Sequence, residues 1–385
     1  MNRTLKMGMV GGGPEAFIGD VHRKAARLDG GVELVAGAFS RSADKSKSMA
    51  AELYLDESRC YPSYQKMVEE ESKLPEGKRI DFVSVVTPNV SHFEVSKAFL
   101  EAGFNVIQDK PMTFTVAQAL ELEQIVEKSG KVFALTHNYT GYPMVKLARD
   151  IVKQGKIGKV LKLVVQYPQG WLADPIENDG AKQAVWRTDP AQSGAAGCMG
   201  DIGTHAENLA EYITGLKMTE ICADLGTMVE GRRLDDDGNC LVHYENGARG
   251  LLFASQISIG ELNAMRIAVH GSTGSLKFDQ EYPNDLQVYS ADGTIHTYRR
   301  GTDAIGEISD AAVRATRLPS GHPEAFFEAF ANIYKNATDT IRAKLEGRAP
   351  TELELDFPSV KDGTRGMQFI EAVVSSKGLW VKLPE

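Results

Sequence analysis

The chain has 385 residues, a formal net charge of −9 at neutral pH, 42% hydrophobic residues and 25% charged residues. This length is enough for two domains with cores of their own, and the composition is typical of an ordinary globular protein. The negative net charge gives nucleic-acid binding no electrostatic support, so we expect no nucleic-acid partner.

The start of the chain contains no signal-peptide core, and no run of 18 apolar residues follows. We therefore expect a cytoplasmic protein that does not insert into membranes. None of the four cysteines forms a C-x-x-C pair, which speaks against a zinc knuckle, a thioredoxin-like site or a disulfide framework. These cysteines are Cys60, Cys198, Cys222 and Cys240.

Strand and helix patterns alternate over the first part of the chain. Strands are predicted over residues 5–11, 32–39, 81–87, 104–108 and 132–136, with helices over 16–28, 44–53, 90–102 and 115–129 between them. Strands separated by helices of this length predict a parallel, doubly wound sheet, which binds ligands beyond the carboxyl ends of its strands. Polar or glycine residues stand at all five of these ends, namely Gly11, Ser40, Thr87, Lys110 and His137.

The pattern changes after a predicted helix over residues 142–154. Strands are predicted over 160–167, 219–228, 239–244, 250–256, 265–270, 275–278 and 286–289, followed by helices over 323–345 and 360–375. Closely spaced strands without intervening helices indicate a mostly antiparallel sheet. We place the domain boundary near Gly141, so that residues 1–140 form an α/β domain with a parallel sheet and residues 141–385 a second α/β domain.

A glycine-rich turn follows the first strand and has the context of a dinucleotide-binding fingerprint. Gly11 and Gly13 fit the glycines that allow a tight turn and a close approach to a pyrophosphate, and Ala16 is an accepted third residue. The alternative third residue is Gly19, which implies an enlarged loop over residues 14–18. A plain strand–helix turn is the remaining alternative.

The second predicted strand ends at Ser40 and Arg41, where NAD-binding sites usually carry a carboxylate for the ribose hydroxyls. A hydroxyl and a guanidinium suit a 2′-phosphate instead, because arginine pairs well with phosphate oxygens. The sequence therefore favours NADP over NAD. A solvated arginine in a polar loop is the alternative.

Two further segments carry groups that move protons. Lys110 precedes Pro111, which favours an extended backbone and fixes where the lysine leaves the strand, so that its ammonium can bond a substrate hydroxyl. Asp201 and His205 lie four residues apart and face the same way on a helix, where an imidazole suits general acid–base work and a carboxylate can orient it. The alternatives are a surface lysine, and a helix N-cap for Asp201.

A metal-dependent reaction finds little support in the sequence. Cys198, Asp201 and His205 do not have a recognisable zinc spacing, so we expect no metal. A serine nucleophile is not indicated either, since the chain contains no G-x-S-x-G motif.

Taken in order along the chain, these segments resemble the Gfo/Idh/MocA oxidoreductases, the group that includes glucose–fructose oxidoreductase and inositol dehydrogenase. The resemblance rests on four stretches: Gly11-Gly12-Gly13 with Gly19-Asp20-Val21-His22, Val86-Thr87-Pro88-Asn89 with His92, Asp109-Lys110-Pro111, and Gly200 to His205. The third stretch has Asp109 where the family's signature has glutamate.

The resemblance implies an N-terminal Rossmann domain and a C-terminal α/β domain whose open antiparallel sheet often mediates oligomers. It implies that His205 takes the hydroxyl proton, that Asp201 tunes it, and that Lys110 positions the oxygen beside the cofactor. Thr87, Pro88, Asn89 and His92 are implied to lie along that cofactor. A homo-oligomer, either a dimer or a tetramer, is the expected assembly.

The family's substrates imply a polyol or sugar for this chain. Candidate substrate-binding residues are Asn138, Tyr167, Trp186, Arg187 and His322. The function predicted first is an NAD(P)-dependent oxidoreductase acting on a secondary hydroxyl of a sugar, a sugar derivative or an inositol. The alternatives are a glycoside hydrolase that uses NAD transiently, and a non-catalytic regulator that binds a dinucleotide.

Overall fold

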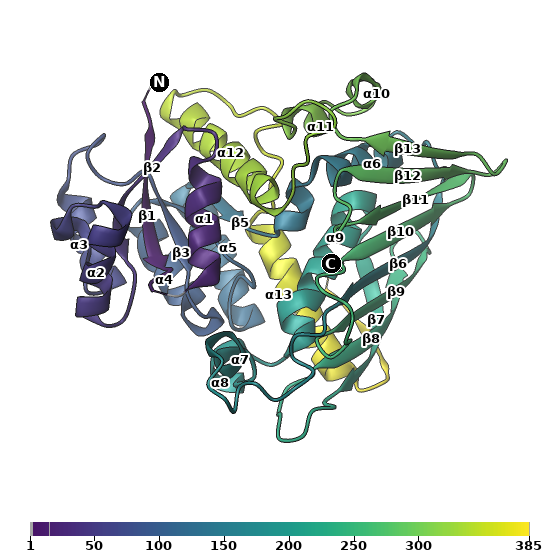
Figure 1. Ribbon diagram of the computed structural model, residues 1–385, viewed down its shortest axis with the longest axis horizontal. Coiled ribbons are helices and arrows are strands. Elements are labelled where there is room, and N and C mark those ends of the chain that lie inside the picture. The colour runs from purple at the N-terminus through teal and green to yellow at the C-terminus, as the bar shows by residue number, and fades with distance from the viewer. Residues whose placement is uncertain (1–2, 15, 385) are drawn as a thin grey trace. The chain divides into compact units, whose positions relative to one another are not determined.

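A computed structural model describes residues 3–14 and 16–384 of the chain (Figure 1). The chain forms two compact units: unit 1 comprises residues 1–138 and 326–364, and unit 2 comprises residues 139–325 and 365–385. The first division falls close to the expected boundary at Gly141. Residues 326–364 belong to unit 1, whereas the sequence predicted them to be part of a second domain of residues 141–385.

Unit 1 contains a parallel sheet of five strands in the order β2-β1-β3-β4-β5, which confirms the predicted doubly wound architecture. Its strands are β1 (Leu5–Gly11), β2 (Val32–Ala38), β3 (Phe82–Val86), β4 (Asn105–Gln108) and β5 (Phe133–Leu135). Its helices include α1 (Phe17–Arg27), α2 (Ala43–Leu53), α3 (Tyr64–Lys73), α4 (His92–Glu101) and α5 (Val116–Ser129). The strand order reverses between β1 and β3, where Gly11 pairs with Val86, and ligands of such sheets bind beyond a reversal of this kind.

Helix α12 (Phe326–Leu345) joins unit 1 because one face of it is apolar. Phe330, Tyr334, Ala337 and Ile341 recur at helical spacing and are all buried in the core formed by β1 and α1. Figure 1 shows α12 beside α1. The sequence did not predict that α12 belongs to unit 1. Its periodicity shows that one face is buried but not which sheet that face packs against.

Unit 2 contains a sheet of nine strands in the order β13-β12-β11-β10-β6-β9-β8-β7-β14, in which only β6 and β9 pair in parallel. The strands are β6 (Val160–Pro168), β7 (Met218–Gly226), β8 (Asp237–Tyr244), β9 (Arg249–Ser255), β10 (Arg266–Gly271), β11 (Gly274–Asp279), β12 (Asp285–Ser290), β13 (Ile295–Arg299) and β14 (Trp380–Lys382). The mostly antiparallel sheet is confirmed. Sequence analysis missed the mostly exposed β13 and the three-residue β14.

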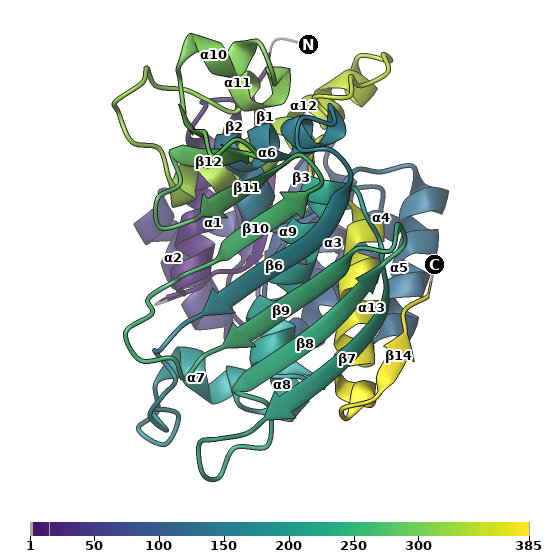
Figure 2. The same ribbon diagram turned by 90° about the vertical axis from the view of Figure 1, so that its right-hand side faces the viewer.

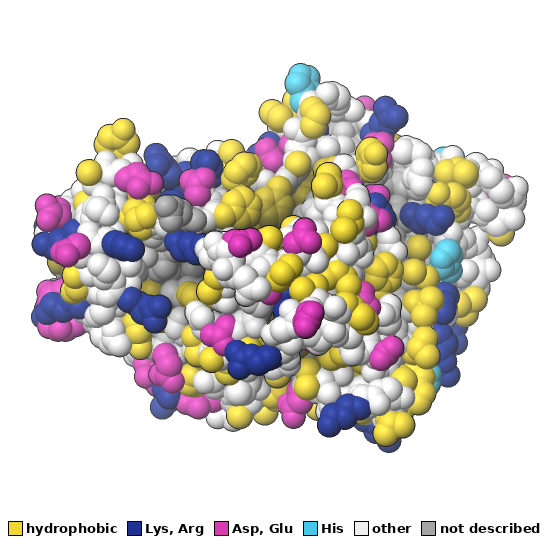
Figure 3. Space-filling view, turned by 60° about the horizontal axis from the view of Figure 1, so that its bottom comes forward, with side chains coloured by type: hydrophobic (Ala, Val, Ile, Leu, Met, Phe, Trp, Pro, Cys, Tyr) yellow, Lys and Arg dark blue, Asp and Glu magenta, His cyan; other side chains and the backbone are white. Residues whose placement is uncertain are grey.

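The long helices of unit 2 are α6 (Pro143–Lys153), α9 (Thr204–Thr214) and α13 (Val360–Ser376), although residues 360–364 of α13 belong to unit 1. The short helices are α7 (Lys182–Arg187), α8 (Pro190–Ser193), α10 (Asp303–Gly306) and α11 (Asp310–Arg314). The long helices lie behind the sheet in Figure 2, and no helix crosses the face turned toward the viewer. Across the described residues, we find no helix with the length and apolarity needed to span a bilayer. Figure 3 shows acidic and basic side chains interspersed on one face of the protein.

Candidate active site

The glycine-rich turn after β1 is closed by a contact between Gly12 and Gly19. A Cβ atom on Gly19 would lie 2.3 Å from the Cα of Gly12, so only glycine allows α1 to approach the turn this closely. Ala16 instead precedes α1 as its N-cap, which corrects its assignment as the third fingerprint residue. The turn therefore has the enlarged loop over residues 14–18. Within this loop, Glu15 lies outside the described residues.

The end of β2 lies directly against this turn. A Cβ atom on Gly13 would lie 2.6 Å from the carbonyl oxygen of Phe39. Ser40 and Arg41 follow, with Arg41 exposed and the Ser40 hydroxyl accepting a hydrogen bond from the amide of Ser42 at 3.2 Å. The structure thus places both predicted ribose-site residues next to the glycine turn.

The carboxylate of Asp109, just after β4, organises the next strand end. Its Oδ1 atom accepts hydrogen bonds from the Lys110 amide at 2.9 Å and from the Thr136 hydroxyl at 3.1 Å. Burial acts to raise the pKa of this carboxyl, but His22, Lys110 and His92 together hold the pKa well below its usual range. Asp109 is therefore ionised, and it fixes the backbone at Lys110 through a charged hydrogen bond.

A fully buried histidine from α1 faces the same carboxylate. Nε2 of His22 lies 3.9 Å from Oδ1 of Asp109, which is too long for a direct hydrogen bond, and has no hydrogen-bond partner among the described residues. Its Nδ1 lies 2.7 Å from the hydroxyl of Tyr334, which in turn lies 2.7 Å from the hydroxyl of Ser84. Elements α1, β3 and α12 thus converge beneath the turn that carries Lys110.

His92 braces the loops that follow β3 and β4. Its two ring nitrogens each lie 2.7 Å from a backbone carbonyl, one of Thr87 and one of Pro111, and burial lowers its pKa. The resemblance implied that His92 lies along a cofactor. These contacts join Thr87 to the Lys110–Pro111 turn, whose peptide bond is cis, and contact of His92 with a cofactor stays a prediction.

Thr87, Pro88 and Asn89 lie between β3 and α4, at the switch point of the sheet. Thr87 Oγ1 is buried and has no hydrogen-bond partner among the described residues. Asn89 is also buried. An unpartnered buried hydroxyl at this edge is a group that a bound ligand would satisfy.

Two consecutive residues after β5 complete the polar end of unit 1. Burial, followed by the charge of Lys110, lowers the pKa of His137 to about 3, so this imidazole is neutral at physiological pH. Asn138 is buried, and its Nδ2 has no hydrogen-bond partner among the described residues. Sequence analysis placed His137 at a strand end but did not include it among the site residues.

In unit 2, the second residue of α9 is His205, whose ring packs against two tyrosines. The ring centroid of Tyr139 lies 4.9 Å away in an edge-to-face arrangement, and that of Tyr167 lies 6.1 Å away. The two tyrosine hydroxyls bond each other, and Asn263 bonds both, at 3.2 Å from Nδ2 and 2.6 Å from Oδ1. Burial raises the pKa of Tyr139 to about 12 and holds the pKa of Tyr167 well above its usual range, so both remain protonated.

Asp201 lies in a π-helical turn, Met199–Gly203, directly before α9. Its Oδ2 atom accepts hydrogen bonds from Nε of Arg187 at 3.0 Å and from Nε2 of Gln256 at 2.9 Å. No side-chain capping bond is found at the start of the turn or of α9, so the N-cap alternative for Asp201 is wrong. The carboxylate is instead held by a cation and an amide, beside the tyrosines whose pKa values its charge helps to raise.

Arg187 lies under two tryptophans. Its guanidinium carbon is 4.2 Å from the ring centroid of Trp186 and 5.9 Å from that of Trp171, distances typical of cation–π contact. Its NH1 group donates to the backbone and side-chain oxygens of Gln183. Its hydrogen bond also holds Asp201, and the predicted contact of Arg187 with substrate stays a prediction.

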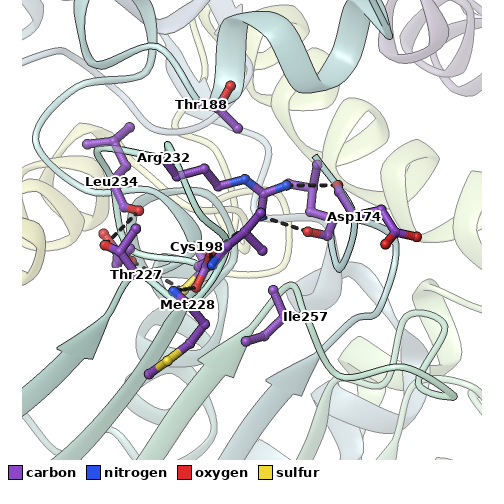
Figure 4. Close-up of polar contacts among 12 residues, drawn as sticks. Asp174, Thr188, Cys198, Thr227, Met228, Arg232, Leu234 and Ile257 are labelled. Carbon is purple, nitrogen blue, oxygen red and sulfur yellow. Dashed lines mark hydrogen bonds and ion pairs between the residues drawn. The ribbon is translucent and has the colours of Figure 1, made fainter. Parts of the chain in front are cut away.

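A second arginine fixes the loops around this turn (Figure 4). Arg232 donates to the carbonyls of Leu172 and Asp174 at 2.7 and 3.0 Å, which connects the segment after Trp171 to the segment after β7. Cys198 donates to Asp235 at 3.2 Å, and burial raises the pKa values of both groups. The residues that precede Asp201 are therefore held by buried polar contacts.

His322 differs from the other predicted substrate residues. It lies on an exposed segment, where its carbonyl accepts a hydrogen bond from Arg300. No hydrogen bond among the described residues joins its ring to the His205 group. Over the same part of the chain, no three His, Cys, Asp or Glu side chains gather closely enough to hold a metal.

The sequence matches two profiles of one family, one over the parallel sheet and one over most of the nine-stranded sheet. Residues 5–137 match the family described as "Oxidoreductase family, NAD-binding Rossmann fold", and residues 145–277 match the "GFO/IDH/MocA C-terminal domain". The oxidoreductase YfiI of Bacillus subtilis is 36% identical over 99% of this chain and 98% of its own length. The chain belongs to the Gfo/Idh/MocA family of oxidoreductases.

Solved structures agree with this assignment over the whole chain. The inositol dehydrogenase homologue of Azotobacter vinelandii, solved with NAD+, has a TM-score of 0.93 and 32% identity over 99% of this chain and 98% of its own. The same homologue with NADH and myo-inositol has a TM-score of 0.91 and 31% identity, with the same coverage. Levoglucosan dehydrogenase of Pseudarthrobacter phenanthrenivorans is 27% identical over 80% of both chains.

The residues at the switch point of unit 1 fit a dinucleotide. The turn closed by Gly12 and Gly19 gives the backbone the tight path that a pyrophosphate site needs. Gly13 is partly exposed, and no acceptor in the described residues takes its N–H. Together with the unpartnered Thr87 hydroxyl, this amide provides hydrogen-bonding capacity for a phosphate or ribose group.

The contacts of Asp109 predict how the free energy of unfolding depends on pH. We expect His22→Gln to raise the pKa of Asp109, because it removes a group that opposes the effect of burial. A carboxyl with a depressed pKa stabilises the fold above its unfolded pKa of about 3.9, and this contribution is lost as the pH falls through the folded pKa. In the variant this contribution is smaller, and its loss, which starts near the unfolded pKa in both proteins, is complete at a higher pH. The free energy of unfolding, measured from neutral to acidic pH, checks this.

Asp109→Asn provides the matched background. In that background His22→Gln can no longer act through a carboxylate at residue 109, so the difference between the two backgrounds isolates the pair. An identical pH dependence of the His22→Gln effect in both backgrounds would show that His22 does not act on Asp109.

Proposed function

We propose that this protein is an NAD(P)-dependent dehydrogenase that oxidises a secondary hydroxyl of a sugar, a sugar derivative or an inositol, with Lys110, Asp201 and His205 as its catalytic residues. The observation that carries the proposal is the order of three consecutive residues. The pKa of His137 responds to Lys110, Asn138 offers an unpartnered amide, and Tyr139 packs against His205. The backbone of residues 137–139 therefore leads directly from the polar residues around Lys110 to those around His205.

The proton chemistry follows from the state of each group. When bound, a nicotinamide dinucleotide supplies the acceptor for the hydride. His205 takes the hydroxyl proton, since imidazole is suited to this task near neutral pH and the neighbouring tyrosines remain protonated. Asp201, held by Arg187 and Gln256, supplies negative charge to this region. The Lys110 ammonium bonds the substrate oxygen and favours its deprotonated form.

The substrate class rests on the relatives and on the chemistry of the side chains. The Azotobacter homologue is solved with myo-inositol, and a second relative is a levoglucosan dehydrogenase. Asn138, Tyr167 and Trp186 provide amide, hydroxyl and aromatic groups, which suit the hydroxyls and the C–H faces of a polyol.

His205→Ala tests the assignment of the base. We expect turnover to fall about a hundredfold or more, as loss of a general base does, while the affinity for NAD(P)+ stays unchanged. The measurements are steady-state kinetics with the best polyol from a substrate screen and dinucleotide binding by fluorescence. His296→Ala, on an exposed position of β13, is the control and keeps full activity. Turnover equal to that of the wild type would remove His205 from the mechanism.

For the cofactor we propose a preference for NADP over NAD. Arg41 is exposed at the end of β2, and a guanidinium there suits a 2′-phosphate. The Azotobacter homologue is solved with NAD+ and NADH, which makes the preference of this chain a point for experiment.

Arg41→Asp is expected to shift the ratio of kcat/KM for NADP+ and NAD+ toward NAD+. A carboxylate at this position repels the 2′-phosphate and can accept hydrogen bonds from ribose hydroxyls. Lys156→Asp makes the same charge change at an exposed position of unit 2 and is expected to leave the ratio unchanged. A ratio that stays the same in Arg41→Asp would mean that this side chain does not meet the ribose.

We also propose that the protein forms a homo-oligomer through the uncovered face of the nine-stranded sheet. Side chains in direct register form an apolar row across six strands: Trp380, Cys222, Leu241, Leu251, Val164 and Ala268. Leu241 and Leu251 are 48% and 41% exposed, respectively. A second copy related by a two-fold axis would cover this row with the same row.

Leu251→Asp is expected to convert the oligomer into a monomer, because a charge in the centre of an apolar interface is costly to bury. Light scattering coupled to size-exclusion chromatography measures the mass. Leu262→Asp, which changes an 80% exposed leucine outside the row, is the control and keeps the oligomer. A wild-type monomer, or an oligomer that survives Leu251→Asp, would contradict the proposed interface.

A further inference from the structure

Arg23, in the middle of α1, is a buried cation whose ion pairing among the described residues is weak. It is 9% exposed, and its guanidinium lies against the glycine turn, where NH1 donates to the carbonyl of Gly12 at 2.7 Å. Its nearest carboxylate among the described residues is that of Asp20, 3.9 Å from NH2. Asp20 is already paired with Lys24 at 2.6 Å and is half exposed.

A buried charge is costly unless a counter-charge is close to it. Burial lowers the pKa of Arg23, and the charges of Asp20 and Glu52 offset this only in part. Arginine nevertheless stays protonated in proteins. Within the described part of unit 1, the positive charge beneath the glycine turn is therefore matched only weakly, by a carboxylate at 3.9 Å that Lys24 also binds.

The hydrogen bond to Gly12 also fixes the direction of the next amide. In a trans peptide the carbonyl and the following N–H point in opposite directions. Because Arg23 holds the Gly12 carbonyl on its own side, the N–H of Gly13 points away from it. That N–H has no acceptor in the described residues, and Gly13 is partly exposed.

We propose that Arg23 is the buried counter-charge for the diphosphate of the dinucleotide and holds the Gly12–Gly13 peptide with its N–H directed to that diphosphate. This inference rests on the proposed dinucleotide-dependent function and adds a positioning residue to it. Arg23 acts through the Gly12 carbonyl and through its charge, which the low-dielectric surroundings screen only weakly.

The test compares ligands with and without a diphosphate, using the full chain. The dissociation constants of NAD(P)+, ADP-ribose and adenosine are measured by calorimetry for the wild type and for Arg23→Met, which keeps the length of the side chain but removes its charge. We expect ADP-ribose and the dinucleotide to bind at least about tenfold more weakly, the loss of one charged hydrogen bond. We expect adenosine to bind equally well, because it has no phosphate.

Two further variants make the result decisive. Arg27→Met, one turn later on the same helix at an exposed position, is the matched control and keeps all three affinities. Arg23→Lys retains the charge and is expected to bind ADP-ribose more tightly than Arg23→Met does. Thermal unfolding reports whether each variant folds; if Arg23→Met does not fold, the comparison of Arg23→Lys with the wild type carries the test, with an expected loss for ADP-ribose and none for adenosine.

The outcomes separate this inference from the proposed function. If the wild type binds no dinucleotide, the proposed function fails. If the wild type binds the dinucleotide but folded Arg23 variants keep its affinity for ADP-ribose within about twofold, or lose adenosine affinity to the same extent, only the role of Arg23 fails.

Discussion

The buried carboxylate of Asp109 is the interaction on which the arrangement of unit 1 depends. It receives the amide of Lys110 and the hydroxyl of Thr136, so it fixes the ends of β4 and β5 together. His22 approaches it from α1, and Tyr334 and Ser84 connect that histidine to α12 and β3. A lysine that follows a carboxylate held in this way leaves the sheet at a fixed position, which suits the substrate contact that we propose for it.

Unit 2 positions Asp201 and His205, which we propose as catalytic groups, by different means. His205 lies against two tyrosines whose hydroxyls are engaged with each other and with Asn263, so the ring is oriented by packing. Asp201 is held by an arginine and an amide. Burial keeps both tyrosines protonated, so neither competes with His205 for the role of base that we propose for it.

Local patterns allowed much of the fold and part of the site to be predicted. Alternating strands and helices indicated the parallel sheet, and the strand ends identified Gly11, Thr87 and Lys110. The role of Gly19 depends on the distance between α1 and the turn, which sequence spacing left open between Gly19 and Ala16. The alignment of α12 with unit 1 was also missed, since an apolar face does not specify its partner.

The residues that position others were the hardest to find from sequence. Arg187 is predictable as a polar residue near the site. Its salt bridge to Asp201 joins two short segments, and no periodic pattern in the sequence shows that these segments lie side by side. The Tyr139–Tyr167–Asn263 group brings together three distant segments, and Arg23 becomes informative only when its burial and the pairing of Asp20 are known. Such contacts depend on tertiary packing, which a single sequence does not reveal.

The central claim is that this protein transfers hydride from a polyol carbon to a nicotinamide. The most direct measurement uses a polyol carrying deuterium on the carbon that is oxidised, together with NAD(P)+, and follows the label by mass spectrometry. The account predicts that the deuterium appears in the reduced nicotinamide in equal amount to the ketone formed. Consumption of the polyol or of a glycoside without net reduced nicotinamide, or with the deuterium retained in the sugar product, would contradict it.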